Sequence, residues 1–265
     1  MSAWIAFRTI SHKEIVRFMR IWSQTLLPPV ITQSLYFLIF GGVIGSQIRE
    51  VPITSLINDS GKNVVPYMAF IVPGLVMMSV ITSSFSNVVS SFFGSKFQRN
   101  IEELLVSPTP NWAIILGYCA GGVLRGLLVG LIVFLVSFFF IRPTVFNPFL
   151  LFLFIFLTAS TFSLGGLLNG IFAKKFDDVS IFPVFVLTPL TYLGGVFYSI
   201  NSLPPFWQAV SRFNPVVYMI DGFRYSFYGF ADVSVALSLG FLTLVTGLLY
   251  SLCHFLISRG YGLRT

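Results

Sequence analysis

The sequence predicts an all-α membrane protein with several spans, and the prediction rests on its composition and on the length of its apolar runs. Hydrophobic residues make up 55% of the 265 residues, aromatic residues 17% and charged residues only 9%. A soluble protein needs more charged side chains than this to cover its surface. About six apolar runs reach the roughly 20 residues with which a helix crosses a bilayer. We therefore expect residues 1–265 to form one polytopic transmembrane domain.

The apolar runs are spread along the whole chain. They cover residues 26–44, 67–93, 112–141, 149–172, 181–200 and 235–256. Cys119 and Cys253 fall inside two of these runs, where thiols usually pack as small apolar groups. We expect no disulfide, no metal site, no bound cofactor and no catalytic residue in this chain.

Ahead of the first run, residues 1–24 predict an amphipathic helix that lies in the plane of the inner leaflet. Its apolar face carries Trp4, Phe7, Ile15, Phe18 and Trp22, and its polar face carries Thr9, Lys13, Arg17 and Arg20. The helix could be a basic anchor that sets the topology, a functional contact, or both. The chain opens without the short apolar core of a cleavable signal peptide, so we expect the mature protein to begin at Met1.

The distribution of basic residues predicts that both termini face the cytoplasm. With this orientation the inner segments carry Arg8, Lys13, Arg17, Arg20, Lys96, Arg99, Lys174, Lys175, Arg259 and Arg264. The outer loops hold only Arg49, Lys62, Arg142, Arg212 and Arg224. The net charge of +7 is therefore largely a topology signal. We expect no nucleic-acid partner, because no basic patch is combined with exposed aromatic residues on a soluble module.

A polar island at residues 95–110 separates the second and third runs and predicts a short cytoplasmic helix. Its apolar stripe, at helical spacing, consists of Phe97, Ile101, Leu104 and Leu105, while Lys96, Arg99, Glu102 and Glu103 face elsewhere. The stripe is too short to cross a bilayer. Ser95 with Gln98 fits a capping box, although Gly94 and Ser95 could instead end the preceding helix. Pro108 and Pro110 end the island.

The third run combines small residues with an intramembrane charge. Glycines recur every four residues, a spacing that lets helices approach closely in lipid. They form two series, Gly117 with Gly121, and Gly122 with Gly126 and Gly130. Arg125 lies among them, and a charge at this depth indicates a functional site unless it serves a structural ion pair or bonds helix carbonyls. The residues alone identify no partner for it.

Prolines interrupt the first, second and fifth runs. They are Pro28, Pro29, Pro73, Pro183 and Pro189. A proline frees a backbone carbonyl, which is tolerated in a membrane where a neighbour or a water-lined path satisfies it. These runs are therefore candidates for moving or path-lining helices.

Residues 199–232 are too polar and too broken to span a membrane, and too apolar to be a free loop. Many aromatic side chains alternate there with Pro204-Pro205, Asn214-Pro215, Gly222 and Gly229. Amphipathic aromatic rings favour the membrane interface. The segment predicts short re-entrant helices that dip into the outer leaflet.

This arrangement resembles the permeases of type-2 ABC exporters (ABC-2 type) over nearly the whole chain. The strongest local matches are Glu102-Glu103-Leu104-Leu105 followed by Pro108, Asn214-Pro215 followed by Asp221-Gly222-Phe223-Arg224, and LTPLTYLGGVFYS at residues 187–199. The chain is most similar to a small bacterial inner-membrane subgroup whose ATPase is a separate polypeptide. The order and spacing of the motifs make the resemblance specific.

The resemblance implies a homodimer of permease chains in the lipid bilayer of the bacterial inner membrane, each docked on an ABC ATP-binding subunit. By position, the coupling helix falls on residues 99–106, with Arg99, Asn100, Ile101, Glu102, Glu103, Leu104 and Leu105. Secondary cytoplasmic contacts fall on Arg17, Arg20, Lys174, Lys175, Asp177 and Asp178. The outer re-entrant motif comprises Asn214, Pro215, Asp221, Gly222 and Arg224. Permeases of this build export lipids, lipid-linked glycans, drugs or peptides.

The sequence also lacks the motifs of an enzyme. No G-x-x-x-x-G-K-[ST] phosphate-binding loop occurs, so ATP and Mg²⁺ would be bound by the partner subunit. His12 and His254 lie near opposite ends of the sequence, and both adjacent acidic pairs sit in polar loops. The alternative is an ion-coupled secondary transporter or channel. That class needs buried ionisable groups and usually inverted repeats, and Arg125 is the one such group in the runs.

Overall fold

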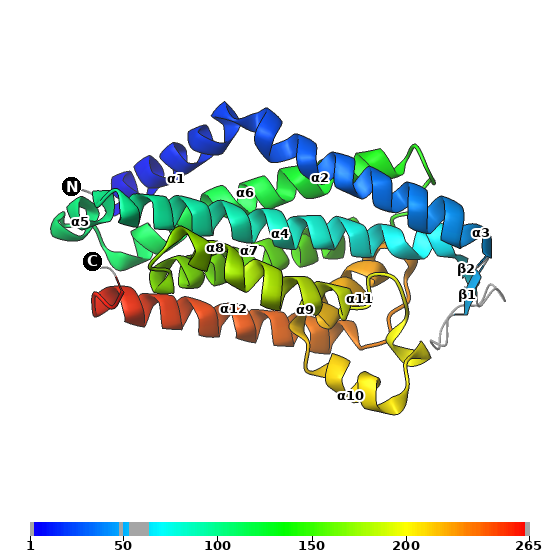
Figure 1. Cartoon of the computed structure of the whole chain (residues 1–265). Helices are drawn as coiled ribbons and strands as arrows, with labels where there is room; N and C mark the ends of the chain where they lie inside the picture. Colours follow the sequence, from blue (N-terminus) through cyan, green and yellow to red (C-terminus); the bar gives the residue numbers. More distant parts are fainter. Residues whose placement is uncertain (1–2, 48–49, 53–63, 263–265) are drawn as a thin grey trace.

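The computed structural model describes residues 3–47, 50–52 and 64–262, and it is built almost entirely from helices (Figure 1). The amino-terminal half contains α1 (Ala3–Arg20), α2 (Trp22–Tyr36) continued by the π-helical segment η1 (Phe37–Ile44), α3 (Gly45–Gln47), α4 (Tyr67–Phe97), α5 (Asn100–Val106) and α6 (Asn111–Ser137). The remainder contains α7 (Pro148–Phe172), α8 (Phe176–Phe182), the π-helical segment η2 (Pro183–Leu187), α9 (Thr188–Tyr192), the 3-10 helix η3 (Ile200–Ser202), α10 (Pro205–Arg212), α11 (Pro215–Tyr228) and α12 (Val235–Ser258). Two short strands, β1 (Glu50–Pro52) and β2 (Val64–Pro66), pair antiparallel with Val51 opposite Val65.

The predicted fold class is confirmed, with five helical segments in the described part of the chain that are long and apolar enough to cross a membrane. They are Trp22–Ile44, Tyr67–Phe97, Asn111–Ser137, Pro148–Phe172 and Val235–Ser258. These correspond to five of the predicted runs. The helices lie roughly side by side along one direction, with both ends of the described chain at the same end of the bundle (Figure 1).

The predicted run at residues 181–200 has different bounds in the structure. Helical structure there begins at Phe176, passes through the π-helical segment η2 and ends at Tyr192. At 1.5 Å per residue this segment is about 25 Å long. Beyond it the chain turns through Gly195, which has a φ of +78° that other residues rarely adopt. The apolar character of residues 193–200 therefore reflects a buried turn and not the end of a span.

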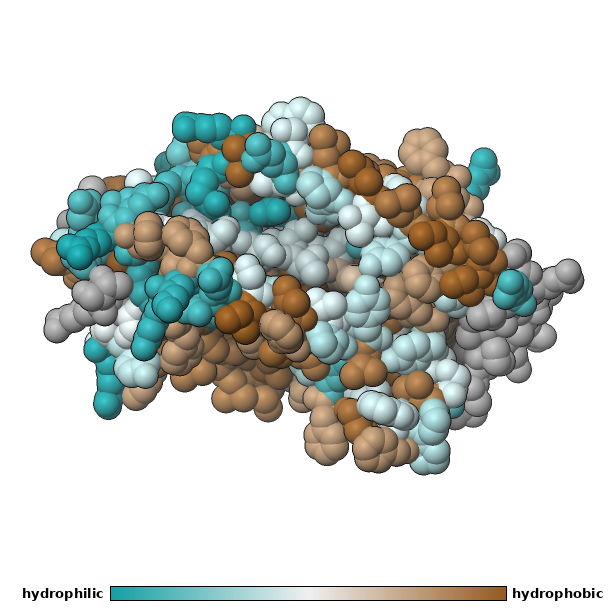
Figure 2. Space-filling view, in the orientation of Figure 1, coloured by the Kyte–Doolittle hydropathy of each residue, from teal (hydrophilic) through white to brown (hydrophobic). Residues whose placement is uncertain are grey.

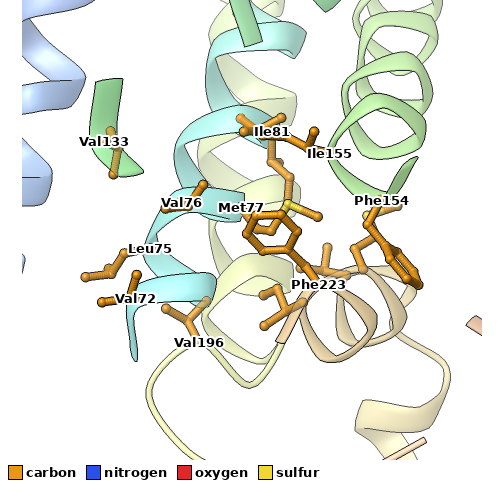
Figure 3. Packing of buried hydrophobic residues seen from close by; sticks show 14 of the residues in the cluster. Val72, Leu75, Val76, Met77, Ile81, Val133, Phe154, Ile155, Val196 and Phe223 are labelled. Atoms are coloured by element: carbon orange, nitrogen blue, oxygen red, sulfur yellow. The ribbon is translucent and has the colours of Figure 1, made fainter. Parts of the chain in front are cut away.

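The core surrounds α4, which lies at the centre of the bundle. Of its most apolar window 89% is buried, compared with 17% for the α2–η1 span and 11% for α12. Figure 3 shows Val76, Met77 and Ile81 of α4 packed among side chains of α7 and α11, with Phe154, Ile155 and Phe223 on the opposing side. Movement of α4 would therefore disturb most of the other helices, whereas α2 and α12 lie at the periphery.

The two glycine series of α6 face different helices. A Cβ atom at Gly121 would lie 2.7 Å from the Cβ of Glu14, so the first series packs against α1. A Cβ atom at Gly122 would lie 2.5 Å from the Oγ of Ser163 in α7, and one at Gly130 would lie 2.7 Å from Val80 in α4. Glycine is needed at these positions because neighbouring side chains fill the space that any larger residue would occupy. Thus α6 packs closely against three helices at once.

Candidate functional site

The polar island forms a separate short helix, α5, at the end of the central helix. The predicted capping box is wrong, because α4 continues through Ser95 to Phe97, as in the alternative reading of that segment. The hydroxyl of Tyr118 donates to Ser95 Oγ at 3.0 Å. Arg99 has a φ of +61°, the only positive value of a non-glycine residue among those described. This turn ends α4, and α5 begins at Asn100.

One face of α5 packs against the bundle and the other is exposed. Ile101 is buried, and Leu104 and Leu105 are half-buried against the same apolar cluster. Glu102 and Glu103 are exposed in the first turn, where the helix dipole favours acidic side chains. The predicted stripe is thus present with one correction. Phe97 belongs to the last turn of α4 and is 60% exposed.

Lys96, expected on the polar surface, is buried instead. Its Nζ donates to the backbone carbonyls of Ile171 at 2.8 Å and Ala173 at 2.7 Å. These carbonyls end α7, and the last carbonyls of a helix lack intrahelical partners. No local pattern predicts this contact, because the partners lie 75 and 77 residues away.

The segment at residues 174–178 lies beside the island. Asp178 accepts the N–H groups of Lys174 at 2.8 Å and Lys175 at 2.9 Å, and these bonds lower the pKa of this exposed carboxyl. The Phe176 ring packs edge-on against Phe97, with ring centroids 4.7 Å apart. Asp177 is exposed, as are both lysines. The structure therefore brings the predicted coupling helix and most of the predicted secondary contact to one end of the bundle.

Arg17, predicted as a secondary cytoplasmic contact, is bonded to residues of α1 and α4. Its Nη2 donates to the backbone carbonyl of Asn87 at 3.0 Å and to Asn87 Oδ1 at 2.9 Å, and its Nε donates to Glu14 at 3.2 Å. Glu14 is fully buried and accepts the hydroxyl of Ser91 at 2.5 Å. A signal for this network was present in the sequence, because Glu14 lies on the apolar face of α1. Arg20 remains exposed.

Arg125 bonds a helix carbonyl, which is one of the alternatives that the sequence left open. Its Nη2 donates to the carbonyl oxygen of Thr25 in α2 at 3.4 Å. Its Nε atom is buried and has no hydrogen-bond partner. Arg125 therefore holds α6 against α2.

The outer re-entrant motif, residues 214–224, makes buried contacts that connect α11 with α9. Asn214 caps α11 by accepting the N–H of Val216 at 3.0 Å, and its amide donates to the carbonyl of Leu190 at 2.7 Å. Pro215 occupies the first helical position, where no N–H is needed. Gly222 packs so closely on Phe154 that no side chain would fit.

The second half of this motif is an ion pair. Arg224, predicted in an outer loop, is only 2% exposed. It lies 3.6 Å from Asp221 and donates to the carbonyl of Gly195 at 2.7 Å. Asp221 also accepts the N–H groups of Asp232 at 3.0 Å and Val233 at 2.7 Å. These contacts fix the turn after α9 to α11 and to the start of α12.

A further feature, not predicted, is a stripe along the central helix. Between residues 75 and 93 of α4, the positions that are not buried are Met78, Thr82, Ser86 and Ser90. They recur every four residues and thus share one face. Figure 1 shows this stretch of α4 between α2 and α8, and Figure 2 shows pale residues along the middle of the same face. We call Met78, Thr82, Ser86 and Ser90 the α4 stripe.

No group of three or more His, Cys, Asp or Glu side chains that could hold a metal occurs in the described ranges. The buried charges are bonded to helix ends, carbonyls and one another.

Known proteins with similar sequences are membrane transport proteins. The family model described as ABC-2 type transporter matches residues 5–228. The chain is 57% identical over 262 residues to the inner membrane transport permease YadH of Escherichia coli (strain K12), covering 99% of this chain and 98% of that protein. It is 25% identical over 199 residues to nodulation protein J of Rhizobium leguminosarum bv. viciae, covering 73% of each. The chain belongs to the ABC-2 type transporter family and is a transmembrane transport permease.

Proposed function

We propose that this chain is the transmembrane subunit of an ATP-driven exporter in the bacterial inner membrane, with both termini in the cytoplasm. A separate ATP-binding subunit docks on α5. The support is the form of α5, an exposed acidic face on a helix whose other face is buried at the end of α4. Family membership and the name of the Escherichia coli relative support the membrane assignment.

The α4 stripe is the observation that carries the transport role. Thr82 and Ser90 donate their hydroxyls to carbonyls of their own helix at 2.9 and 3.1 Å, and the Ser86 side chain is exposed. A hydroxyl exposed in hydrocarbon is unfavourable, because it loses hydrogen bonds to water. The exposed Ser86 hydroxyl therefore favours a water-lined path beside the stripe, whereas the Thr82 and Ser90 hydroxyls are already bonded within their own helix. A second copy of the chain closes the path, since one copy leaves the stripe open.

Force reaches the path through α4 itself. Because α5 follows α4 after the single turn at Arg99, closure of two ATPase subunits would push α5 against the end of the central helix. The core packs around α4, so a small shift there changes the packing of α6, α7 and α11 together. This change would switch the path between inward and outward access.

The test is to produce the chain with a candidate ABC ATP-binding subunit and to measure co-purification and ATP hydrolysis in lipid nanodiscs. We expect a complex whose hydrolysis depends on the permease. The variant Glu102→Lys with Glu103→Lys should release the ATPase or uncouple its hydrolysis. The matched pair Glu102→Gln with Glu103→Gln, which removes charge without reversing it, should have a smaller effect.

Two outcomes would overturn the proposal. One is co-purification and hydrolysis unchanged by the charge reversal. The other is uptake into vesicles that a proton gradient drives in the absence of any ATPase. The second outcome would assign the chain to ion-coupled transport.

A further inference from the structure

The ammonium group of Lys96 joins two helices at the end of the bundle that carries α5. Lys96 is 5% exposed, and its two bonds go to the carbonyls of Ile171 and Ala173 at the end of α7. A cation is favoured at a helix carboxyl end, where carbonyls without partners carry partial negative charge. The contact lies four residues before Asn100, the first residue of α5.

An aromatic cluster forms a second connection at the same place. The Phe176 ring packs edge-on against Phe93 and Phe97, with centroid distances of 5.1 and 4.7 Å. The turn that carries Phe176 is itself fixed, because Asp178 accepts two of its N–H groups. The end of α4 is therefore joined to the end of α7 by the hydrogen bonds of Lys96, and to the start of α8 by the rings of Phe93 and Phe97.

The helical segment that follows Phe176, made of α8, η2 and α9, also contacts α4. From Phe176 the chain runs through α8 and the π-helical segment η2 to α9 without leaving helical structure. The Phe182 ring at the end of α8 stacks on Phe85 of α4, with centroids 5.4 Å apart. α8 thus lies against α4 at the level of Thr82 and Ser86 in the α4 stripe.

We propose that Lys96 is a positioning residue that makes α5 and the turn at residues 174–178 one rigid docking surface, so that movement of α5 also moves α8 and η2. This inference rests on the proposed function. If the residue at position 96 only had to fill space, an apolar side chain would do so at a lower cost in free energy. Burying an ammonium group requires full compensation by hydrogen bonds. Lysine differs from an apolar residue here because its ammonium group bonds two carbonyls at the end of α7 to the last turn of α4, next to α5.

The experiment measures the distance between α5 and α8. In a background with Cys119→Ala and Cys253→Ala, spin labels are placed at Val106→Cys and Ser180→Cys, both exposed positions. Labelled chains are mixed with an excess of unlabelled chains and studied by pulsed electron paramagnetic resonance, alone and in complex with the ATPase, with and without trapped ATP. With Lys96 present we expect one narrow distance distribution that nucleotide does not change.

Lys96→Met should broaden this distribution and reduce permease-dependent stimulation of ATP hydrolysis by about fivefold or more, the lower end of typical coupling between sites. Lys96→Arg, which retains donors for both carbonyls, should restore both values. Arg259→Met removes an exposed cytoplasmic charge and should change neither. If the methionine variant does not accumulate, Lys96→Leu, which also lacks a hydrogen-bond donor, carries the same test.

An unchanged narrow distribution and unchanged stimulation in the Lys96→Met protein would overturn the inference. Failure of the unmodified chain to bind or stimulate any ATPase would instead overturn the proposed function. The two failures are distinguishable, because the distance between the labels at positions 106 and 180 in the permease alone measures the connection between α5 and α8 without any ATPase.

Discussion

The guanidinium group of Arg125 donates to the carbonyl oxygen of Thr25, and Thr25 lies four residues before Pro29. In a regular helix that carbonyl would accept the N–H of residue 29, which proline lacks. Arg125 thus provides the donor that Pro29 removes, although at 3.4 Å the bond is long. Arg125 and Pro29 are therefore connected through the Thr25 carbonyl.

A double-mutant cycle tests this relationship. Arg125→Leu leaves the Thr25 carbonyl without a donor, and we expect a loss of about 1–3 kcal/mol in the free energy of unfolding. Adding Pro29→Ala should recover part of this loss, because residue 29 then supplies an N–H. The measurement is thermal unfolding in one detergent for all four proteins. Strictly additive effects would show that the two residues act independently.

The ion pair between buried Glu14 and half-buried Arg17 predicts an unequal effect of replacing one residue or both. Arg17→Met leaves a buried carboxylate with reduced compensation, and we expect about 3–5 kcal/mol of destabilisation. The double variant Glu14→Leu with Arg17→Met should be more stable than Arg17→Met alone. Arg20→Met, at an exposed position, should stay within about 0.5 kcal/mol of the unmodified chain. Equal stability of the Arg17 and Arg20 variants would show that the bonds of Arg17 do not stabilise the fold.

The glycines of α6 and α12 should respond in opposite ways to alanine. Gly121→Ala forces a Cβ atom to within 2.7 Å of Glu14 Cβ, so we expect about 1–3 kcal/mol of destabilisation from overpacking. Gly240 in α12 has nothing within 4 Å of its would-be Cβ atom. Gly240→Ala should be neutral, or stabilising by up to about 1 kcal/mol through helix propensity. Thermal unfolding of both variants provides the comparison, and a loss at Gly240 equal to that at Gly121 would argue against close packing.

The α4 stripe predicts a pattern of water access. In the background with Cys119→Ala and Cys253→Ala, Ser86→Cys should react with a charged, water-soluble thiol reagent in membranes. Leu248→Cys, 62% exposed on α12, should react slowly because its surroundings are lipid. The rates are compared by mass shift of the purified protein. Slow labelling at residue 86 and fast labelling at residue 248 would place the path elsewhere.

Local patterns predicted the long helices because apolar length and spacing are read from neighbouring residues. The run predicted at 67–93 begins at the same residue as α4, and Pro108 marks the end of the island. The bonds of Lys96, and those of Arg17 to Asn87, could not be predicted in this way, since these partners lie 70 or more residues away. The run at 181–200 was misplaced because a buried turn is as apolar as a span. Glu14 was visible in the sequence as an acidic residue on an apolar face.

Site-specific photo-crosslinking can show whether an ATP-binding subunit docks on α5. A photoreactive amino acid replaces Glu103, or Phe146 at the opposite end of the bundle, in chains produced with the ATP-binding subunit. We expect a crosslinked permease–ATPase product from position 103 and none from position 146. A crosslink from position 146 with none from position 103 would contradict docking on α5.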